Sequence, residues 1–173
     1  MLHGKKIIAL CLSKVNDEVS HDYIMGLSTF FEKRNWNLFV YATCTDLFWN
    51  TPDDKGESAV FSLINYDITD AVIILDEKIK SPAIIENIER KCGEKNIPVI
   101  FAGGMKKGHY SLEFDYEEGF ARVIRHVIDD HGVTDLHMIA GIKGNDFSES
   151  RIAVFKNVLE EKGIEFSDNM VSY

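Results

Sequence analysis

Short apolar runs alternate along the chain with longer stretches in which apolar residues recur at helical spacing. The runs are continuous rather than alternating, which is typical of strands buried on both faces of a sheet. Five runs have this character: Lys6–Leu12, Leu38–Ala42, Ala71–Leu75, Pro98–Ala102 and Leu136–Ala140. The stretches between and after them predict helices over Asp22–Arg34, Asp54–Tyr66, Pro82–Lys95, Glu117–His131 and Ser148–Lys162.

Strands that alternate with helices predict βαβ units. The predicted fold class is therefore α/β, a doubly wound parallel sheet with helices on both faces. One connection is longer than the few residues usual in such a domain. It runs through the glycine-containing stretch Gly103–Tyr110 into a short extended piece, Ser111–Asp115. We interpret this piece as a crossover between two lobes.

Composition and charge narrow the function classes. The chain has 173 residues, of which 45% are hydrophobic and 27% charged, which is ordinary for a globular protein. A formal net charge of −9 disfavours direct binding to nucleic-acid phosphates or to anionic membranes. The N-terminal apolar run is too short for a signal peptide or a membrane span, so we expect a cytoplasmic protein. The three cysteines form no CxxC pair and are expected to be buried, reduced thiols.

No constellation of catalytic residues is found. The loop of residues 13–17, after the first strand, lacks the glycines of a dinucleotide fingerprint, and GGMKKGHY lacks the Gly-Lys-Ser/Thr ending of a P-loop. His126 and His131 are five residues apart on a predicted helix, which places their imidazoles on different faces. We therefore predict neither a cofactor nor a metal, and do not expect the segment to be an enzyme.

A phosphoacceptor domain is one alternative. Asp76 ends the third predicted strand, and Lys143 follows the fifth, as the acceptor and its partner would. Such a site also needs acidic residues clustered at the first strand to hold Mg²⁺, and Asp17 lies several residues beyond that strand.

Six blocks of sequence resemble, in order, one family. The family has the type I periplasmic-binding-protein-like fold that lactose-repressor-type regulators use to sense effectors. The blocks are KKIIALCL, DYIMGLSTFFEKRNWNLFVYAT, YDITDAVIIL, KNIPVIFAGG, FDYEEGFARVIRHVIDDHGVTDLHMIAG and ESRIAVFKNVLEEKGI. The resemblance implies two lobes around a ligand cleft: residues 1–110 as the first lobe, and residues 111–173 as the crossover and start of an incomplete second lobe. That lobe would pack on its own chain or swap with a partner. Because the family's second lobe runs further, we expect a fragment of a longer protein.

The resemblance also implies a set of ligand-binding candidates. The loop of residues 13–17 matches the family's first cleft segment, but it has Asn16-Asp17-Glu18 where the family usually has Asn-Pro-Phe, whose ring stacks on a sugar. This departure favours a polar or cationic ligand over a sugar. Gly103 and Gly104 likewise replace a common Asp-Arg pair. The candidates are Ser13, Asn16, Asp17, Asp76, Asp115 and Arg151.

Two candidates have an alternative structural role. Asp115 matches the family's crossover aspartate, but it also precedes Glu117 and Glu118 as a helix N-cap should. Arg151 matches an arginine that reaches the cleft from the first turn of its helix, and its guanidinium suits a ligand carboxylate or a pair of hydroxyls. It could equally pair on the surface with Glu149.

Together these observations predict a non-catalytic, cytoplasmic, homodimeric domain that senses an unknown small molecule and controls a C-terminal output. The stretch HGVTDLHMIAGIKGNDFSESR is similar to sensor regions that precede GGDEF-type diguanylate cyclase domains in bacteria, which implies that output and would make the whole protein an enzyme. One alternative is the effector-binding and dimerisation domain of a lactose-repressor-type regulator without its DNA-binding headpiece. Another is a dimerisation module with no ligand.

Overall fold

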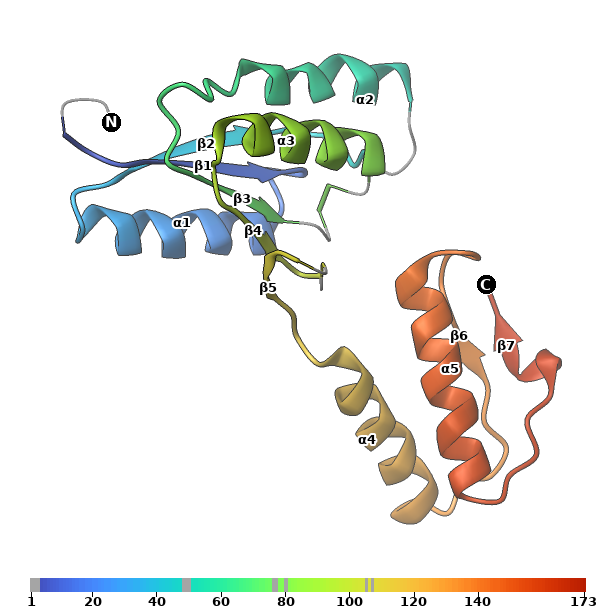
Figure 1. Ribbon diagram of the computed structural model, residues 1–173. Helices are drawn as coiled ribbons and strands as arrows, with labels where there is room; N and C mark the ends of the chain where they lie inside the picture. Colours follow the sequence, from blue (N-terminus) through green and yellow to red (C-terminus); the bar gives the residue numbers. More distant parts are fainter. Residues whose placement is uncertain (1–3, 48–50, 76–77, 80, 105, 107) are drawn as a thin grey trace. The chain divides into compact units, whose positions relative to one another are not determined.

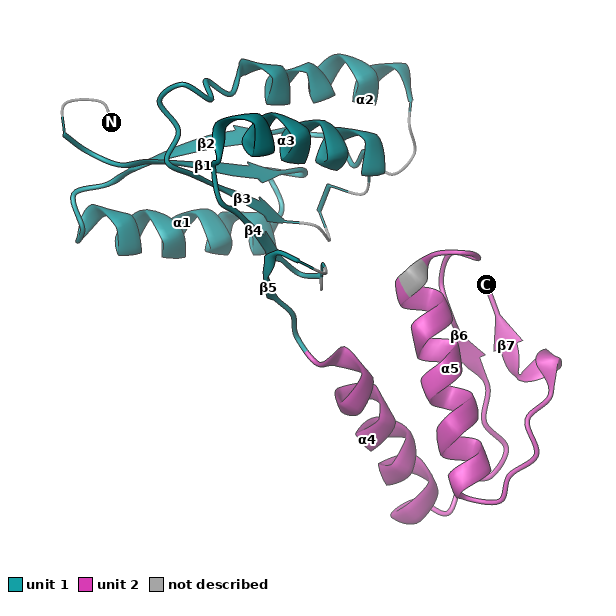
Figure 2. Ribbon diagram, in the orientation of Figure 1, with its two compact units in different colours: residues 1–114 teal, residues 115–173 magenta. Residues whose placement is uncertain are grey.

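The computed structural model describes the chain except for residues 1–3, 48–50, 76–77, 80, 105 and 107, and describes only the backbone of residue 146. It contains two compact units, residues 1–114 (unit 1) and residues 115–173 (unit 2) (Figure 1, Figure 2). Each unit has its own hydrophobic core, and each is described by itself below.

Unit 1 is built on a five-stranded parallel sheet. Its strands are β1 (Ile7–Leu12), β2 (Asn37–Ala42), β3 (Ala71–Leu75), β4 (Val99–Ala102) and β5 (Tyr110–Leu112), in the order β2-β1-β3-β4-β5. The first four coincide with predicted apolar runs. The fifth comes from the connection that the sequence marked as extended, and the Leu136–Ala140 run belongs to unit 2 instead.

Helices cover both faces of this sheet (Figure 1). Helix α1 (Glu18–Glu32) lies on one face, and α2 (Pro52–Glu57) and α3 (Pro82–Lys95) lie on the other. Apolar residues of β1 and β3 alternate between a cluster with α1 and a cluster with α3, and every residue of β1 is buried. This double burial explains why the strands are continuous apolar runs rather than alternating ones.

Side-chain caps fix where α1 and α2 begin. The sequence predicted a helix from Asp22, but α1 starts four residues earlier because the Asp17 side chain accepts a hydrogen bond from the Ser20 backbone N–H at 2.9 Å. The predicted helix over residues 54–66 is instead α2 followed by a 3₁₀ helix, Ser58–Leu63. Thr51 and Asp54 form the capping box that starts α2.

The cysteines behave in two ways. Cys11 and Cys92 are buried in unit 1, as predicted, whereas Cys44 is exposed because it follows the end of β2. Burial raises the pKa of the Cys92 thiol to about 11 and the pKa of Cys11 further still. Both buried thiols therefore stay protonated and unreactive at neutral pH.

Unit 2 contains two long helices and a small sheet. Its elements are α4 (Tyr116–Asp129), β6 (Met138–Ile139), α5 (Asp146–Glu161), a 3₁₀ helix (Asp168–Met170) and β7 (Val171–Ser172). The strands β6 and β7 pair in parallel. The core lies between the helices and this sheet and is centred on Phe155 and Leu159.

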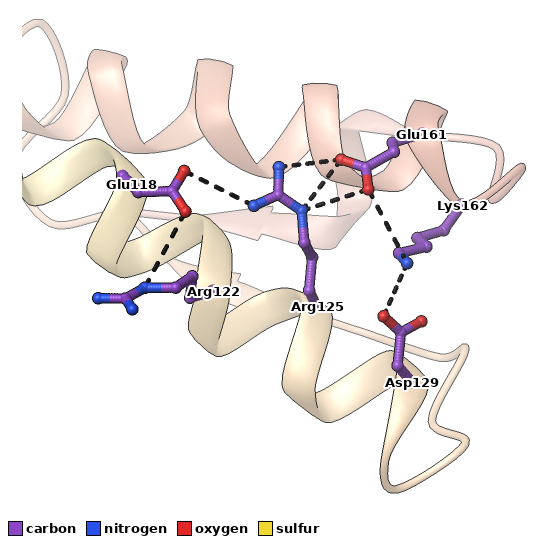
Figure 3. A network of polar contacts seen from close by, with 6 residues as sticks. All are labelled: Glu118, Arg122, Arg125, Asp129, Glu161 and Lys162. Carbon is purple, nitrogen blue, oxygen red and sulfur yellow. Dashed lines mark hydrogen bonds and ion pairs between the residues drawn. The ribbon is translucent and has the colours of Figure 1, made fainter.

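Ion pairs join α4 to the end of α5 (Figure 3). Arg125 lies between two carboxylates, at 3.0 Å from Glu161 and 3.7 Å from Glu118. Lys162 reaches back to Asp129 at 2.7 Å. The carboxylates of these pairs are about half-exposed, so water screens the charges and the apolar core supplies most of the stability. Among the described residues, no helix is both long and apolar enough to cross a bilayer.

Candidate functional site

We expect a ligand site at the carboxyl ends of the parallel strands of unit 1, because such sheets bind ligands at that edge. The segments that follow β1, β2, β3 and β4 all carry charged side chains there. We call this region the carboxyl edge. Its defining residues are Ser13, Lys14, Asp17, Asp46, Lys78, Glu89, Lys106 and His109.

Ser13, a predicted ligand contact, fastens two loops together instead of facing solvent. The residue is buried, and its hydroxyl donates a hydrogen bond to the backbone oxygen of Lys78, in the segment after β3. The Ser20 hydroxyl donates in turn to the backbone oxygen of Ser13 at 3.2 Å. The segments after β1 and β3 are therefore held against each other and against the start of α1.

Asp17, another predicted ligand contact, also links the segment after β1 to Lys78. Besides capping α1, its carboxylate accepts a hydrogen bond from the Lys78 ammonium at 2.6 Å. That bond and the Ser20 N–H together hold the pKa of Asp17 below its usual value. Asn16 is exposed beside it. Asp76 lies outside the described residues.

Acid should weaken this arrangement. Because the pKa of Asp17 is lower in the folded protein than in the unfolded chain, its stabilising contribution is present above about pH 4 and is lost as the pH falls through the lowered value. We expect Asp17→Asn, which can still cap α1, to flatten the acid dependence of the urea midpoint between pH 5 and pH 3.

The matched control is Asp22→Asn, on the same helix, whose side chain is largely exposed beside His21. Its acid dependence should follow that of the wild type. A midpoint that falls as steeply in Asp17→Asn as in the wild type would contradict the assignment.

The segment after β2 is braced by two charged contacts. Lys14, in a left-handed backbone conformation, places its ammonium 3.1 Å from Asp46. Glu57 accepts hydrogen bonds from the backbone N–H groups of Cys44 and Thr45 at 2.7 and 2.9 Å and from the Thr45 hydroxyl. The Thr45 N–H is the largest cause that lowers the pKa of Glu57. Glu57 thus fixes the backbone at the end of β2.

A third charged group lies at the end of β4. Glu89, from α3, pairs with the Lys106 ammonium and lies 3.1 Å from Nε2 of His109. Both basic side chains rest on the ring of the buried Phe101, with Lys106 Nζ 4.6 Å from its centroid and the His109 ring edge-on at 5.3 Å. Phe101 therefore links the core of unit 1 directly to its carboxyl edge.

The remaining candidates, Asp115 and Arg151, belong to unit 2 and line different cavities. Asp115 caps α4 by accepting from the Glu118 N–H at 2.9 Å, which is its alternative role. Arg151 is exposed on α5 and lines a mainly apolar cavity of about 530 Å³ with Tyr116, Ile139 and others. Asp115 does not line that cavity. Glu149, the expected surface partner of Arg151, instead accepts from the Gly144 N–H at 2.9 Å.

Sequence reasoning missed most of the carboxyl edge. Lys14 and Lys78 each follow an apolar run by a few residues, which is the signal that could have found them. The sequence could not show which residues they pair with, since the partner of Lys78 is Asp17, 61 positions away. Glu89 lies in mid-helix with no sequence signal at all.

Solved structures of other proteins share the fold of this chain. The transcription regulator CcpA of Lactococcus lactis aligns over 98% of this chain and 59% of its own, with a TM-score of 0.68 and 17% identity. A sugar-binding LacI-family regulator from Escherichia coli, complexed with phosphate, aligns over 96% of this chain with a TM-score of 0.69 and 14% identity. The fold is the type I periplasmic-binding-protein-like fold.

A third match extends the comparison to a sugar complex. The CelR–cellobiose complex covers 98% of this chain and 51% of its own, with a TM-score of 0.65 and 14% identity. The predicted fold class is thus confirmed, and identities this low establish the fold alone. The chain spans between 51% and 59% of the length of these three regulators. No protein-family model and no curated protein matches the sequence. The comparisons give no support to the predicted diguanylate cyclase output.

Proposed function

We propose that the chain is the effector-sensing part of a lactose-repressor-type transcription regulator, acting in the cytoplasm as a homodimer. The observation that carries the proposal is the alignment of nearly the whole chain with regulators of this type. A bound small molecule would favour one arrangement of the protein over another, and that shift would alter the output. This is the alternative that the sequence left open, and we adopt it in place of a cyclase output.

The carboxyl edge supports a polar, uncharged ligand rather than a cationic one. Asp17, Asp46 and Glu89 are each paired with a lysine, so no carboxylate among them is left to attract a cation. Paired ammonium and carboxylate groups present donors and acceptors side by side, which suits hydroxyl or amide groups. A neutral ligand would bind there without leaving a charge unpaired.

Arg151 is the residue we propose as a direct ligand contact from unit 2. Within the described part of the chain, no carboxylate lies within ion-pair distance of its guanidinium, and the side chain is exposed at the rim of a cavity. A guanidinium without an ion-pair partner can donate several hydrogen bonds to the oxygens of a ligand.

Thermal unfolding of the full-length gene product against a library of small polar metabolites tests ligand binding. We expect at least one compound to raise the melting temperature, since a ligand at 100 times its Kd stabilises by about 2.7 kcal/mol. Arg151→Ala should weaken that ligand at least tenfold in a calorimetric titration.

The matched control is Arg122→Ala, another largely exposed helical arginine of unit 2. Equal affinity loss in both variants would overturn the role of Arg151. A library without a single stabilising compound would favour a dimerisation module instead.

The output needs a separate measurement. We expect the full-length gene product to bind DNA, with an affinity that changes when the stabilising metabolite is added. Incubation with GTP provides the opposite test. Production of a cyclic dinucleotide would overturn the regulator proposal and restore the diguanylate cyclase.

A further inference from the structure

Two histidines meet at the end of α4, against the expectation from their spacing. The helix ends at Asp129, and Gly132, with φ of +66°, turns the chain while its N–H donates to the Ile128 carbonyl at 3.0 Å. His131 therefore lies in a turn rather than on a helix face. Its Nε2 atom is 3.1 Å from Nε2 of His126, and the rings are nearly perpendicular, with centroids 4.7 Å apart.

Asp130 determines which nitrogen of His126 carries the proton when that ring is neutral. Its carboxylate oxygen lies 2.5 Å from Nδ1 of His126. A carboxylate only accepts hydrogen bonds, so Nδ1 of His126 carries a proton. In the neutral ring the other nitrogen, Nε2, which faces His131, then carries a lone pair. Carboxylates orient metal-binding histidines in this same way, through the nitrogen that does not bind the metal.

The spacing of the two nitrogens suits a shared metal ion. Imidazole nitrogens bind Zn²⁺ at about 2.0–2.1 Å, and two of them 3.1 Å apart subtend an angle of roughly 100° at the metal. That angle lies between the octahedral and tetrahedral values. The aligned peptide dipoles of α4 give its C-terminal end a partial negative charge, which favours a cation.

We propose that His126 and His131 bind a divalent transition-metal ion such as Zn²⁺, Ni²⁺ or Cu²⁺ through their Nε2 atoms, with Asp130 as the positioning residue. On binding, the proton on Nε2 of His131 moves through solvent to its Nδ1, so the hydrogen bond between the rings is replaced by two bonds to the metal. Imidazole ligands select these ions over Mg²⁺ and Ca²⁺, which prefer oxygen.

The site has two protein ligands, and water completes the coordination shell. No group of three metal-binding side chains occurs among the residues that the structure describes. Both imidazoles are exposed, so the ion reaches them from solvent. The proposal is independent of the effector function, because it rests only on residues 126–132.

Calorimetric titration of the whole chain with Zn²⁺ and Ni²⁺ tests the site. We expect one ion per chain and no binding of Mg²⁺. His126→Gln and His131→Gln should each lower the affinity at least tenfold. Asp130→Asn should lower it about tenfold, as is usual for a residue that orients a ligand. The matched control is His137→Gln, another exposed histidine beside a carboxylate, 3.4 Å from Asp135.

Nitrogen NMR of the imidazoles in the wild-type protein tests the same site without any substitution, so it does not depend on whether a variant folds. Zn²⁺ should shift the Nε2 signals of His126 and His131 together at one stoichiometric equivalent and leave those of His137 in place. The proposal is overturned if the wild type binds neither ion, if His137→Gln loses as much affinity as His131→Gln, or if the two Nε2 signals do not respond.

Discussion

Replacing Phe101 by alanine is expected to destabilise unit 1 by about 3–5 kcal/mol, the usual cost of deleting a buried phenylalanine ring. Phe101 is fully buried in the cluster that joins β1, β3 and β4 to α3. The same ring supports Lys106 and His109, so its loss should also loosen the segment after β4. Urea unfolding followed by tryptophan fluorescence measures the effect, since Trp36 packs against the core of unit 1 and the sequence has no tryptophan after residue 114.

The control for this variant is Tyr110→Ala, an aromatic residue on β5 that is 75% exposed. It should shift the midpoint little, since surface substitutions usually stay within about 0.5 kcal/mol. A similar loss in both variants would show that ring burial at Phe101 does not anchor the sheet.

Phe155→Ala should unfold unit 2 and leave unit 1 folded. Phe155 is 2% exposed at the centre of the only core that unit 2 has among the described residues. A small unit has little stability to lose, and the expected cost of about 3–5 kcal/mol equals or exceeds it. The helical signal from α4 and α5 should disappear from the circular dichroism spectrum at 25 °C, while the fluorescence midpoint stays at the wild-type value.

Lys156→Ala provides the comparison at the neighbouring position. Lys156 is exposed, with its ammonium 4.4 Å above the Phe166 ring, and its removal should leave the dichroism spectrum unchanged. If Phe155→Ala removes the helical signal and also lowers the urea midpoint of tryptophan fluorescence, the two units do not unfold separately.

The sequence predicted the sheet of unit 1 well where burial alone determines structure. The runs that became β1 and β3 are buried on both faces, so hydrophobicity marks them without ambiguity. Helix starts were less certain, since Asp17 looks the same in sequence whether it caps a helix or meets a ligand. Its hydrogen bond to the Ser20 N–H decides that it caps α1.

Strand β5 shows what a local pattern cannot supply. It has only three residues, and Tyr110 and Leu112 are exposed, so it lacks the apolar run that marks the other strands. Its place in the sheet comes from pairing with β4, including a bond from the Gly103 N–H to the Leu112 carbonyl at 2.8 Å. Such pairing depends on how the intervening turn folds, which hydrophobicity does not encode.

The candidate site was predicted only in part for the same reason. The family resemblance pointed to Ser13 and Asp17, and both residues do lie at the carboxyl edge. What they contact there is Lys78, and contacts between residues so distant in sequence require the fold itself. The imidazole pair at the end of α4 was missed because the helix was expected to continue through His131, whereas it ends at Asp129.

The attachment of Ser13 to the Lys78 backbone has a practical consequence for protein engineering. A designer who wished to transplant a new specificity onto this scaffold could not exchange the segment after β1 alone, because its buried hydroxyl would lose its acceptor. The segments around Ser13 and Lys78 therefore have to be exchanged together, and the exchange has to keep the Asp17–Lys78 ion pair. Grafts that respect this pairing keep the start of α1 intact.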